Sequence, residues 1–297
     1  IYKERGWNDK HLISYMESHD EERASYKIKT YGNSSGGYDT KTLAHRSDRI
    51  IQASAFFYTI PGPKMIYMFE ELGYDISIDN PCRVCEKPIL WNYYNDQHRQ
   101  KIYFYMASMM DMRKKYDVFN TSNFSYALNG ASKRINLNSS SMNATVVGNF
   151  DVVQKDVYPN FQQTGIWYDY FSGDSITVTN ASAPISFAPG EWHIYTDVKL
   201  TDAAFMDITE AGLTNLKPFM VYPNPSAGVV DILLDFPQGT AVAWSLRDVR
   251  GKVAAQGNLV TDGPQITGLD FAALPKGAYI LQLQTPAEVY AERLLLN

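Results

Sequence analysis

The spacing of apolar residues changes character twice along this 297-residue chain, near residue 118 and near residue 215. Residues 1–117 alternate between strand-like and helix-like patterns, which favours βα units with parallel strands. Residues 118–203 consist of short segments rich in Val, Ile, Thr and aromatic residues, which predicts a small antiparallel β-domain. Residues 215–297 carry short alternating strands divided by Gly and Pro turns, and this pattern predicts a β-sandwich. The chain is therefore expected to be multidomain.

One helix of the first region is predicted by the spacing of its apolar residues and by a sequence that ends it. Leu43, Ile50 and Phe57 recur every seven residues and so lie on one helical face, and the Pro-Gly-Pro run at 61–63 stops the helix. Residues 13–16 and 64–69 read as short strands, the second with the near-continuous apolar run of a buried parallel strand.

A second helix follows, with apolar residues spaced 3, 4, 3 and 4 apart from Ile102 to Tyr116. Its methionines are expected to fill the core, because the flexible thioether side chain adapts to irregular gaps. These residues are Met106, Met109, Met110 and Met112.

Composition narrows the classes of partner. The chain carries 27 Lys and Arg against 32 Asp and Glu, which leaves no basic surplus to bind a nucleic-acid backbone. No transmembrane segment is predicted, because apolar stretches such as residues 53–60 are much shorter than the ~20 residues that span a bilayer. The chain begins with Ile1, so we expect that processing or truncation has removed what came before.

The two cysteines, Cys82 and Cys85, lie in one short segment and cannot staple the whole fold. A zinc site is disfavoured because the five histidines are scattered singly. A local disulfide and a pair of free thiols both remain open.

The sharpest candidate for chemistry is the pair His19-Asp20, at the end of the first predicted strand. Catalytic side chains collect at the carboxyl ends of strands in parallel α/β architectures. On physical grounds alone, an equally good alternative is that Asp20 caps the following segment or pairs with Arg23.

The residues around this pair resemble the α-amylase family, glycoside hydrolase family 13. The resemblance rests on five landmarks in order: residues 15–20, the helix 44–59, residues 61–67, residues 70–75, and residues 86–91 followed by a helix ending at 112–116. It implies a (β/α)8 barrel, of which residues 1–117 would be the last two strands with their helices. Residues 118–203, with the segments 165–169 and 190–195, resemble the antiparallel domain that follows the barrel in this family.

The resemblance assigns roles to individual residues. Asp20 would be the carboxylate that stabilises the transition state, and His19 would contact the sugar. Glu71 and Tyr74, on the rim after the eighth strand, are further candidates for substrate contact. In the family the nucleophile Asp lies at the fourth strand and the acid Glu at the end of the fifth, so the resemblance implies that both lie upstream of Ile1. Arg46-Ser47-Asp48 imitates the nucleophile motif but lies inside a predicted helix and is rejected. This polypeptide alone is therefore expected to be inactive, whereas its full-length parent would be a retaining α-glucan hydrolase.

Aromatic residues of the β-domain have two interpretations. They are either core, which is the favoured interpretation, or a platform on which sugar rings stack. The residues are Trp167, Tyr168, Trp192 and Tyr195. No cofactor is evident, and calcium is possible in the full-length parent because it is common in the family.

The third region resembles the C-terminal sorting domain of the type IX secretion system. Three landmarks carry the resemblance: residues 222–228, residues 246–253 and residues 274–281. It implies that residues 215–297 contact the secretion machinery and that the protein is secreted or held on the outer-membrane surface of a Gram-negative bacterium. The single basic residue Arg293 near the terminus departs from many relatives and leaves anchoring open. The alternative is a generic Ig-like accessory module.

The sequence as a whole predicts a secreted α-amylase-type glycoside hydrolase acting on α-glucan polysaccharides or oligosaccharides. The alternatives are a non-catalytic glycan-binding or surface-attachment protein, and a transglycosylating or branching member of the same family.

Overall fold

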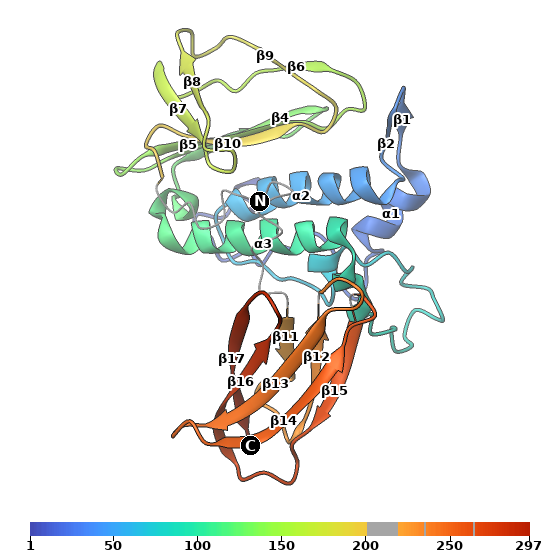
Figure 1. The fold of residues 1–297 in the computed structure, drawn as a ribbon. Coiled ribbons are helices and arrows are strands. Elements are labelled where there is room, and N and C mark those ends of the chain that lie inside the picture. Colours follow the sequence, from blue (N-terminus) through green and yellow to red (C-terminus); the bar gives the residue numbers. More distant parts are fainter. Residues whose placement is uncertain (201–218, 235, 264) are drawn as a thin grey trace. The chain divides into compact units, whose positions relative to one another are not determined.

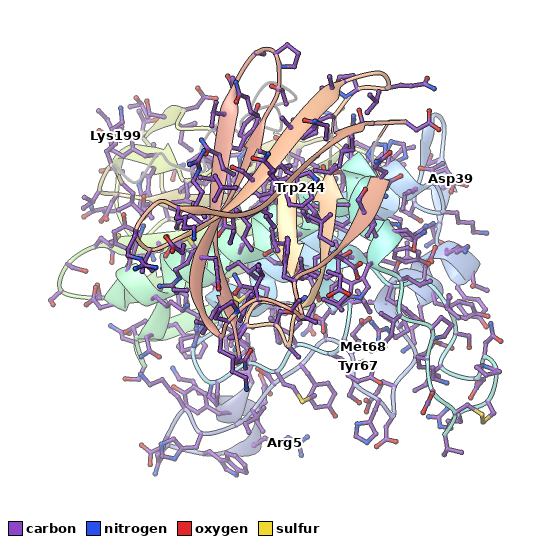
Figure 2. All side chains as sticks on the ribbon, turned by 60° about the horizontal axis from the view of Figure 1, so that its bottom comes forward. Arg5, Asp39, Tyr67, Met68, Lys199 and Trp244 are labelled. Carbon is purple, nitrogen blue, oxygen red and sulfur yellow. A yellow bond between two sulfur atoms is a disulfide. The ribbon has the colours of Figure 1, made fainter. Side chains whose placement is uncertain are left out.

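The computed structural model describes residues 1–200, 219–234, 236–263 and 265–297 (Figure 1; side chains in Figure 2). The chain divides into two compact units, Ile1–Thr209 and Glu210–Asn297. Residues 201–203 of the predicted β-domain and residues 215–218 of the predicted β-sandwich region lie outside the described residues. The boundary predicted between residues 117 and 118 falls inside the first unit and stays a prediction.

The helices of the first unit lie before residue 121. The predicted helix at 43–59 is confirmed: Thr42 caps its first turn by accepting a hydrogen bond from the backbone N–H of His45, and the helix ends before Pro61. Asp96 caps the second long helix in the same way. The α-helices are α1 (Ala24–Tyr31), α2 (Leu43–Thr59) and α3 (Gln97–Lys115), and the 3-10 helices are η1 (Tyr2–Arg5), η2 (Glu70–Leu72), η3 (Trp91–Asn95) and η4 (Asp117–Asn120).

The prediction of two parallel strands at 13–16 and 64–69 is wrong in extent. A single parallel bridge joins Ser14 to Lys64, with the Ser14 N–H 3.1 Å from the Pro63 oxygen and the Met65 N–H 2.9 Å from the Ser14 oxygen. The direction is as expected, but within the described residues neither segment has a second neighbouring strand to extend the ladder. Ile13 and Tyr15 are consequently 59% and 45% exposed.

The second part of this unit is an antiparallel sheet of six strands in the order β3-β4-β5-β10-β7-β8, which confirms the antiparallel prediction. It lies between helices α2 and α3 on one side and a two-stranded sheet, β6-β9, on the other (Figure 1). A further two-stranded hairpin, β1-β2, precedes α2. The strands are β1 (Ser34–Ser35), β2 (Tyr38–Asp39), β3 (Phe124–Ala127), β4 (Ser132–Asn138), β5 (Asn143–Asn149), β6 (Lys155–Val157), β7 (Gly165–Asp169), β8 (Ser175–Val178), β9 (Ile185–Phe187) and β10 (Trp192–Thr196).

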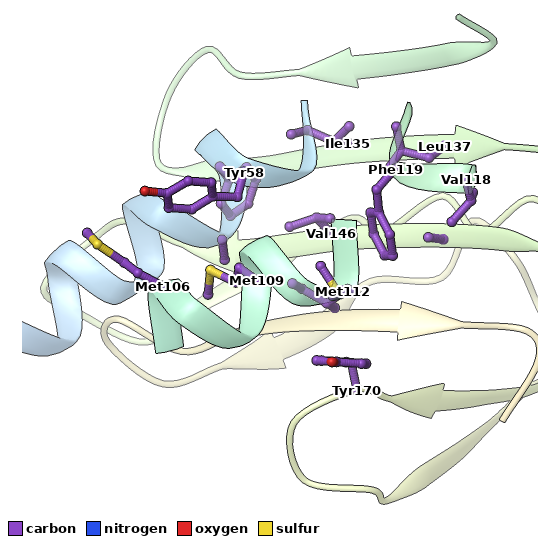
Figure 3. Close-up of a cluster of buried hydrophobic side chains, with 14 of the residues drawn as sticks. Tyr58, Met106, Met109, Met112, Val118, Phe119, Ile135, Leu137, Val146 and Tyr170 are labelled. Carbon is purple, nitrogen blue, oxygen red and sulfur yellow. The ribbon is translucent and has the colours of Figure 1, made fainter. Parts of the chain in front are cut away.

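One hydrophobic core joins the helices to this sheet (Figure 3). Met106, Met109 and Met112 of α3 are fully buried in it, which confirms the prediction that the methionines fill the core, and Met110 packs against its edge. Val146 of β5 belongs to the same cluster, so the helices and the sheet stabilise one another.

The second unit is a β-sandwich, as predicted. A three-stranded sheet, β11-β12-β15, and a four-stranded sheet, β14-β13-β16-β17, contribute to one core. Val230, Ile232 and Leu234 of β12 are buried in this core, in agreement with their alternation in the sequence. The strands are β11 (Phe219–Tyr222), β12 (Val229–Leu234), β13 (Ala241–Asp248), β14 (Val253–Val260), β15 (Gln265–Asp270), β16 (Gly277–Gln284) and β17 (Val289–Leu296).

Among the described residues, none of the helices combines the length and the apolar character needed to cross a membrane.

Candidate functional site

His19 and Asp20 lie together on an exposed bend between the bridged segment and α1. The His19 Nε2 atom is 3.3 Å from Asp20 Oδ2, and the two side chains are 75% and 72% exposed. The alternative that Asp20 caps the next helix or pairs with Arg23 is wrong, because Arg23 itself occupies the N-cap position of α1 and its guanidinium turns inward. The Asp20 side chain is therefore turned toward solvent, with His19 beside it.

Arg23 holds this bend through contacts on its buried side. Its guanidinium lies 2.9 Å from Glu17 Oε1, between the rings of Tyr67 and Tyr74 at 4.7 and 4.5 Å, and it donates to the backbone oxygen of Met68 (Figure 2 labels Tyr67 and Met68). Glu17 and Arg23 are each 2% exposed, so the pair is fully desolvated. Sequence reasoning missed this pair, although two opposite charges six positions apart flanking His19-Asp20 were a usable signal.

The residues after the second bridged segment are more buried than expected for a cleft rim. Glu70 is 2% exposed, and this burial raises its pKa to about 8. Glu71 is half-buried, and burial raises the pKa of its carboxyl as well. Tyr74 is 1% exposed, and its hydroxyl donates to the Pro88 oxygen at 2.9 Å. The roles of Glu71 and Tyr74 as substrate contacts stay predictions.

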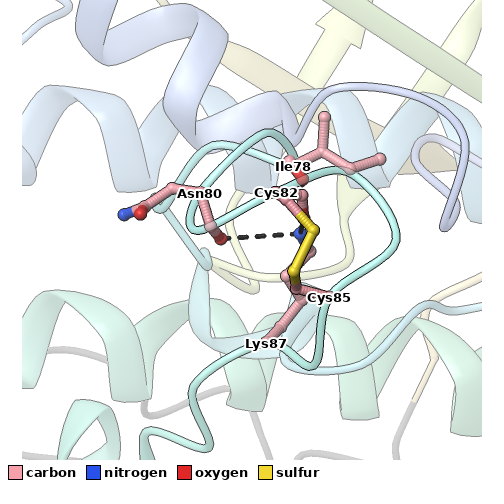
Figure 4. The surroundings of a disulfide bond; sticks show 5 residues. All are labelled: Ile78, Asn80, Cys82, Cys85 and Lys87. Carbon is pink, nitrogen blue, oxygen red and sulfur yellow. Dashed lines mark hydrogen bonds between the residues drawn. A yellow bond between two sulfur atoms is a disulfide. The ribbon is translucent and has the colours of Figure 1, made fainter.

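A disulfide closes a short loop (Figure 4), and this loop is hydrogen-bonded to the bend that carries Asp20. Cys82 and Cys85 form the disulfide, and Lys87 donates to the Ile78 and Cys82 oxygens within the loop. Arg83 of this loop donates to the backbone oxygen of Asp20. Of the two alternatives left open by the sequence, a local disulfide and a pair of free thiols, the structure shows the disulfide.

A second attachment joins the loop and the bend. Glu22 accepts hydrogen bonds from the Ser77 hydroxyl at 2.7 Å and from the Ile78 N–H at 2.9 Å. The bend is therefore held from two sides, by Glu17–Arg23 beneath and by the loop alongside.

The base of the loop is fixed by a buried aspartate. Asp75 is 7% exposed and lies 3.0 Å from Arg46, 3.2 Å from Arg99 and 3.2 Å from Lys29. The Tyr93 hydroxyl donates to the same carboxylate at 2.5 Å. Burial alone would raise the pKa of Asp75, but the Tyr93 hydrogen bond and the surrounding cations outweigh it and hold the pKa below its usual range.

The predicted aromatic platform divides into two groups. Trp167 and Tyr195 are 0% and 5% exposed in the core between the six-stranded sheet and β6-β9, which confirms the core interpretation for these two. Tyr168 and Trp192 are half-buried.

Within the described ranges, no group of three or more His, Cys, Asp and Glu side chains is arranged to hold a metal ion.

Comparisons with known proteins agree with this organisation. The family model of the secretion system C-terminal sorting domain matches residues 220–297. No curated protein matches the chain.

Solved structures match the first part of the chain. A variant of AmyP in complex with maltotriose is 14% identical over 63% of this chain and 41% of its own length, with a TM-score of 0.51. AmyP in complex with maltose is 16% identical over 61% of this chain and 40% of its own, with a TM-score of 0.50. An α-amylase from Geobacillus thermoleovorans in complex with acarbose is 13% identical over 66% of this chain and 41% of its own, with a TM-score of 0.48.

At these identities the similarity is one of fold, and this chain spans about 41% of the length of AmyP. The resemblances drawn from the sequence motifs are thus confirmed at the level of fold and domain. Residues 220–297 match the family model of the secretion system C-terminal sorting domain, and the part before them shares its fold with AmyP.

Proposed function

We propose that this chain is the C-terminal part of a secreted α-amylase-type glycoside hydrolase that cleaves α-glucans with retention of configuration. The observation that carries the proposal is the fold similarity to AmyP over 63% of the chain, together with an exposed His19-Asp20 pair that directly follows the first bridged segment. The sorting domain indicates secretion. Release into the medium or retention at the outer-membrane surface would follow from how that domain is processed.

Asp20 has the chemistry that the proposal needs. Glycosidic cleavage passes through an oxocarbenium-like transition state, and a fixed carboxylate beside the developing positive charge lowers the barrier. The two attachments of the bend, Glu17–Arg23 and the disulfide loop, would hold the Asp20 backbone in place while its carboxylate stays open to substrate. His19, next to it, would donate a hydrogen bond to a sugar hydroxyl. The covalent nucleophile and the general acid would come from further strands of the barrel.

Exposed apolar residues support the presence of such strands. Ile13, Tyr15, Met65 and Ile66 lie on the two bridged segments and are 59%, 45%, 37% and 37% exposed. Neighbouring barrel strands would bury these side chains and complete the backbone hydrogen bonds of both segments.

The test uses the complete reading frame that contains this chain. We expect Asp20→Asn to reduce kcat/KM for starch hydrolysis by roughly 10³-fold or more, because it removes one transition-state charge contact while keeping the shape. Asp156→Asn is the matched control, since Asp156 is also an exposed aspartate but lies on β6 of the β-domain. Release of reducing ends measures the rate.

Two results would contradict the proposal. One is wild-type activity in the Asp20→Asn protein. The other is starch hydrolysis by residues 1–297 alone at the rate of a complete enzyme. A reading frame without a nucleophile Asp and an acid Glu would favour the glycan-binding alternative, and transfer of glucose units to sugar acceptors instead of water would favour the transglycosylating one.

A further inference from the structure

A pocket of about 400 Å³ opens in the first unit, away from the His19-Asp20 bend. It lies between α2, α3 and the turn that leads into β10. None of the four predicted site residues lines it. Its lining residues of most consequence are Tyr38, Asp48, Lys101, Tyr105, Glu191 and Trp192.

One wall of the pocket is polar. Asp48 of α2 and Lys101 of α3 form an ion pair, with Lys101 Nζ 2.8 Å from Asp48 Oδ1, and their side chains are 40% and 34% exposed. Because both side chains are partly exposed, the pair offers a ligand hydrogen-bond acceptors and donors while its own net charge is zero. The same wall presents Tyr105, and burial, with the carboxylates of Asp169 and Asp48, raises its pKa to about 12, so that its hydroxyl stays a neutral donor.

The Trp192 ring lines the pocket next to Tyr105. The Trp192 ring lies 5.8 Å from the Tyr105 ring and 5.3 Å from the Phe171 ring, each pair at a steep angle. Trp192 is half-buried and so keeps part of its surface for the pocket. For both Trp167 and Trp192, the sequence left open a place in the core and a sugar-stacking role. Trp167 is completely buried in the core.

The turn that closes the pocket is pre-formed. The Glu191 carboxylate accepts from the Ala188 N–H at 2.6 Å and lies 3.1 Å from His193 Nε2, while His193 Nδ1 lies 2.7 Å from Asp169. Gly190 has φ 76°, and a Cβ there would come within 2.3 Å of the Tyr38 hydroxyl. A pocket held in shape before binding loses little entropy when a ligand enters.

We propose that this pocket binds a glucose unit of an α-glucan at a second, non-catalytic site. A pyranose combines hydroxyl groups with an apolar C–H face, and the lining of the pocket combines an acid–base pair and a tyrosine hydroxyl with a tryptophan ring. A charged ligand would gain nothing from a pair whose charges cancel. The choice of α-glucan rests on the proposed function, whereas the site itself rests on the geometry of the pocket.

The experiment uses residues 1–297 and maltotriose, followed by the indole N–H resonances of the five tryptophans. We expect the Trp192 resonance to shift on titration and that of Trp167 to stay in place. Asp48→Asn is expected to weaken binding at least tenfold. Asp111→Asn is the matched control, because Asp111 also pairs with a lysine of α3 at 2.7 Å and is similarly exposed, but does not line the pocket.

Trp192→Leu should abolish the binding that Asp48→Asn weakens, and Asp48→Asn remains informative if the tryptophan variant misfolds. The proposal is overturned if maltotriose does not bind, or if it binds equally to wild type and Asp48→Asn. If cellotriose binds with the same dependence on Asp48 and maltotriose does not, the α-glucan assignment of the pocket is overturned. Failure of the proposed function is read separately, from Asp20→Asn and starch hydrolysis.

Discussion

Two neighbouring parts of the first unit differ in the buried contacts at their centres. The part beside the bridged segments contains buried ion pairs, Glu17 with Arg23 and Asp75 with Arg46 and Arg99. The six-stranded sheet contributes a group of aliphatic side chains that are 0% exposed: Ile135, Leu137, Val146 and Ile194.

The difference teaches where each part is vulnerable. Removing one partner of a buried ion pair leaves an uncompensated charge in a poorly polarisable interior, whereas trimming an aliphatic side chain leaves a cavity. Both penalties depend on burial, so the exposed counterparts of the same residue types in the same unit serve as controls.

The largest effect is expected from Asp75→Ala, which would leave Arg46 and Arg99 buried without their carboxylate. We expect a loss of about 3–5 kcal/mol in the free energy of unfolding of the first unit, measured by urea titration. Asp79→Ala, which breaks a pair exposed to solvent on both sides, should change it by less than about 1 kcal/mol. Equal losses from the two substitutions would remove the distinction between the buried and exposed pairs.

A smaller effect is expected from Ile194→Ala in the centre of the six-stranded sheet. Deleting this fully buried side chain should cost about 2–4 kcal/mol, since it leaves a cavity among close-packed neighbours. Ile13→Ala on the bridged segment should cost about 0.5 kcal/mol or less in this chain, because Ile13 is 59% exposed. In the complete reading frame the cost of Ile13→Ala should rise, and an unchanged value there would argue against burial by further strands.

The smallest effect is expected from the positive charge of His193 in the β-domain, and it concerns how stability depends on pH. Burial disfavours the His193 cation, but hydrogen bonds with Asp169 and Glu191 outweigh it and raise the pKa of His193 to about 9. Its stabilising contribution is therefore complete below the unfolded pKa near 6.5 and is lost as the pH rises through about 9, by roughly 2–3 kcal/mol.

The measurement compares wild type with His193→Gln between pH 6.5 and 9.5. Only the difference between the two proteins isolates His193, because Lys64, whose pKa burial lowers to about 7, titrates in both. A constant difference across this range would show that His193 is not held as a cation.

Sequence patterns predicted those helices and strands that are determined by residues close together in the chain. The helix at 43–59 follows from its seven-residue period and from the Pro-Gly-Pro stop, and the inward face of β12 follows from alternation. The bridged segments were overestimated as strands, because a strand depends on neighbours that its own residues do not encode.

The site shows the same limit. His19-Asp20 was visible because its two residues are adjacent in the sequence, and the structure places both side chains on an exposed bend. The pairing of Asp75 with Arg46 and Arg99 spans 29 and 24 positions, so no local spacing could reveal it. The tryptophans at 167 and 192 both lie on strands of the β-domain, and tertiary packing buries the first in the core and leaves the second on a pocket wall.

The disulfide between Cys82 and Cys85 has a consequence for when the candidate site reaches its final covalent form. Thiols stay reduced in the bacterial cytosol and pair in oxidising compartments, and the sorting domain at residues 220–297 indicates secretion. The loop that touches the Asp20 backbone would therefore acquire its final covalent form only during export. The oxidation state of this pair would then record, in each molecule, which side of the inner membrane it has reached.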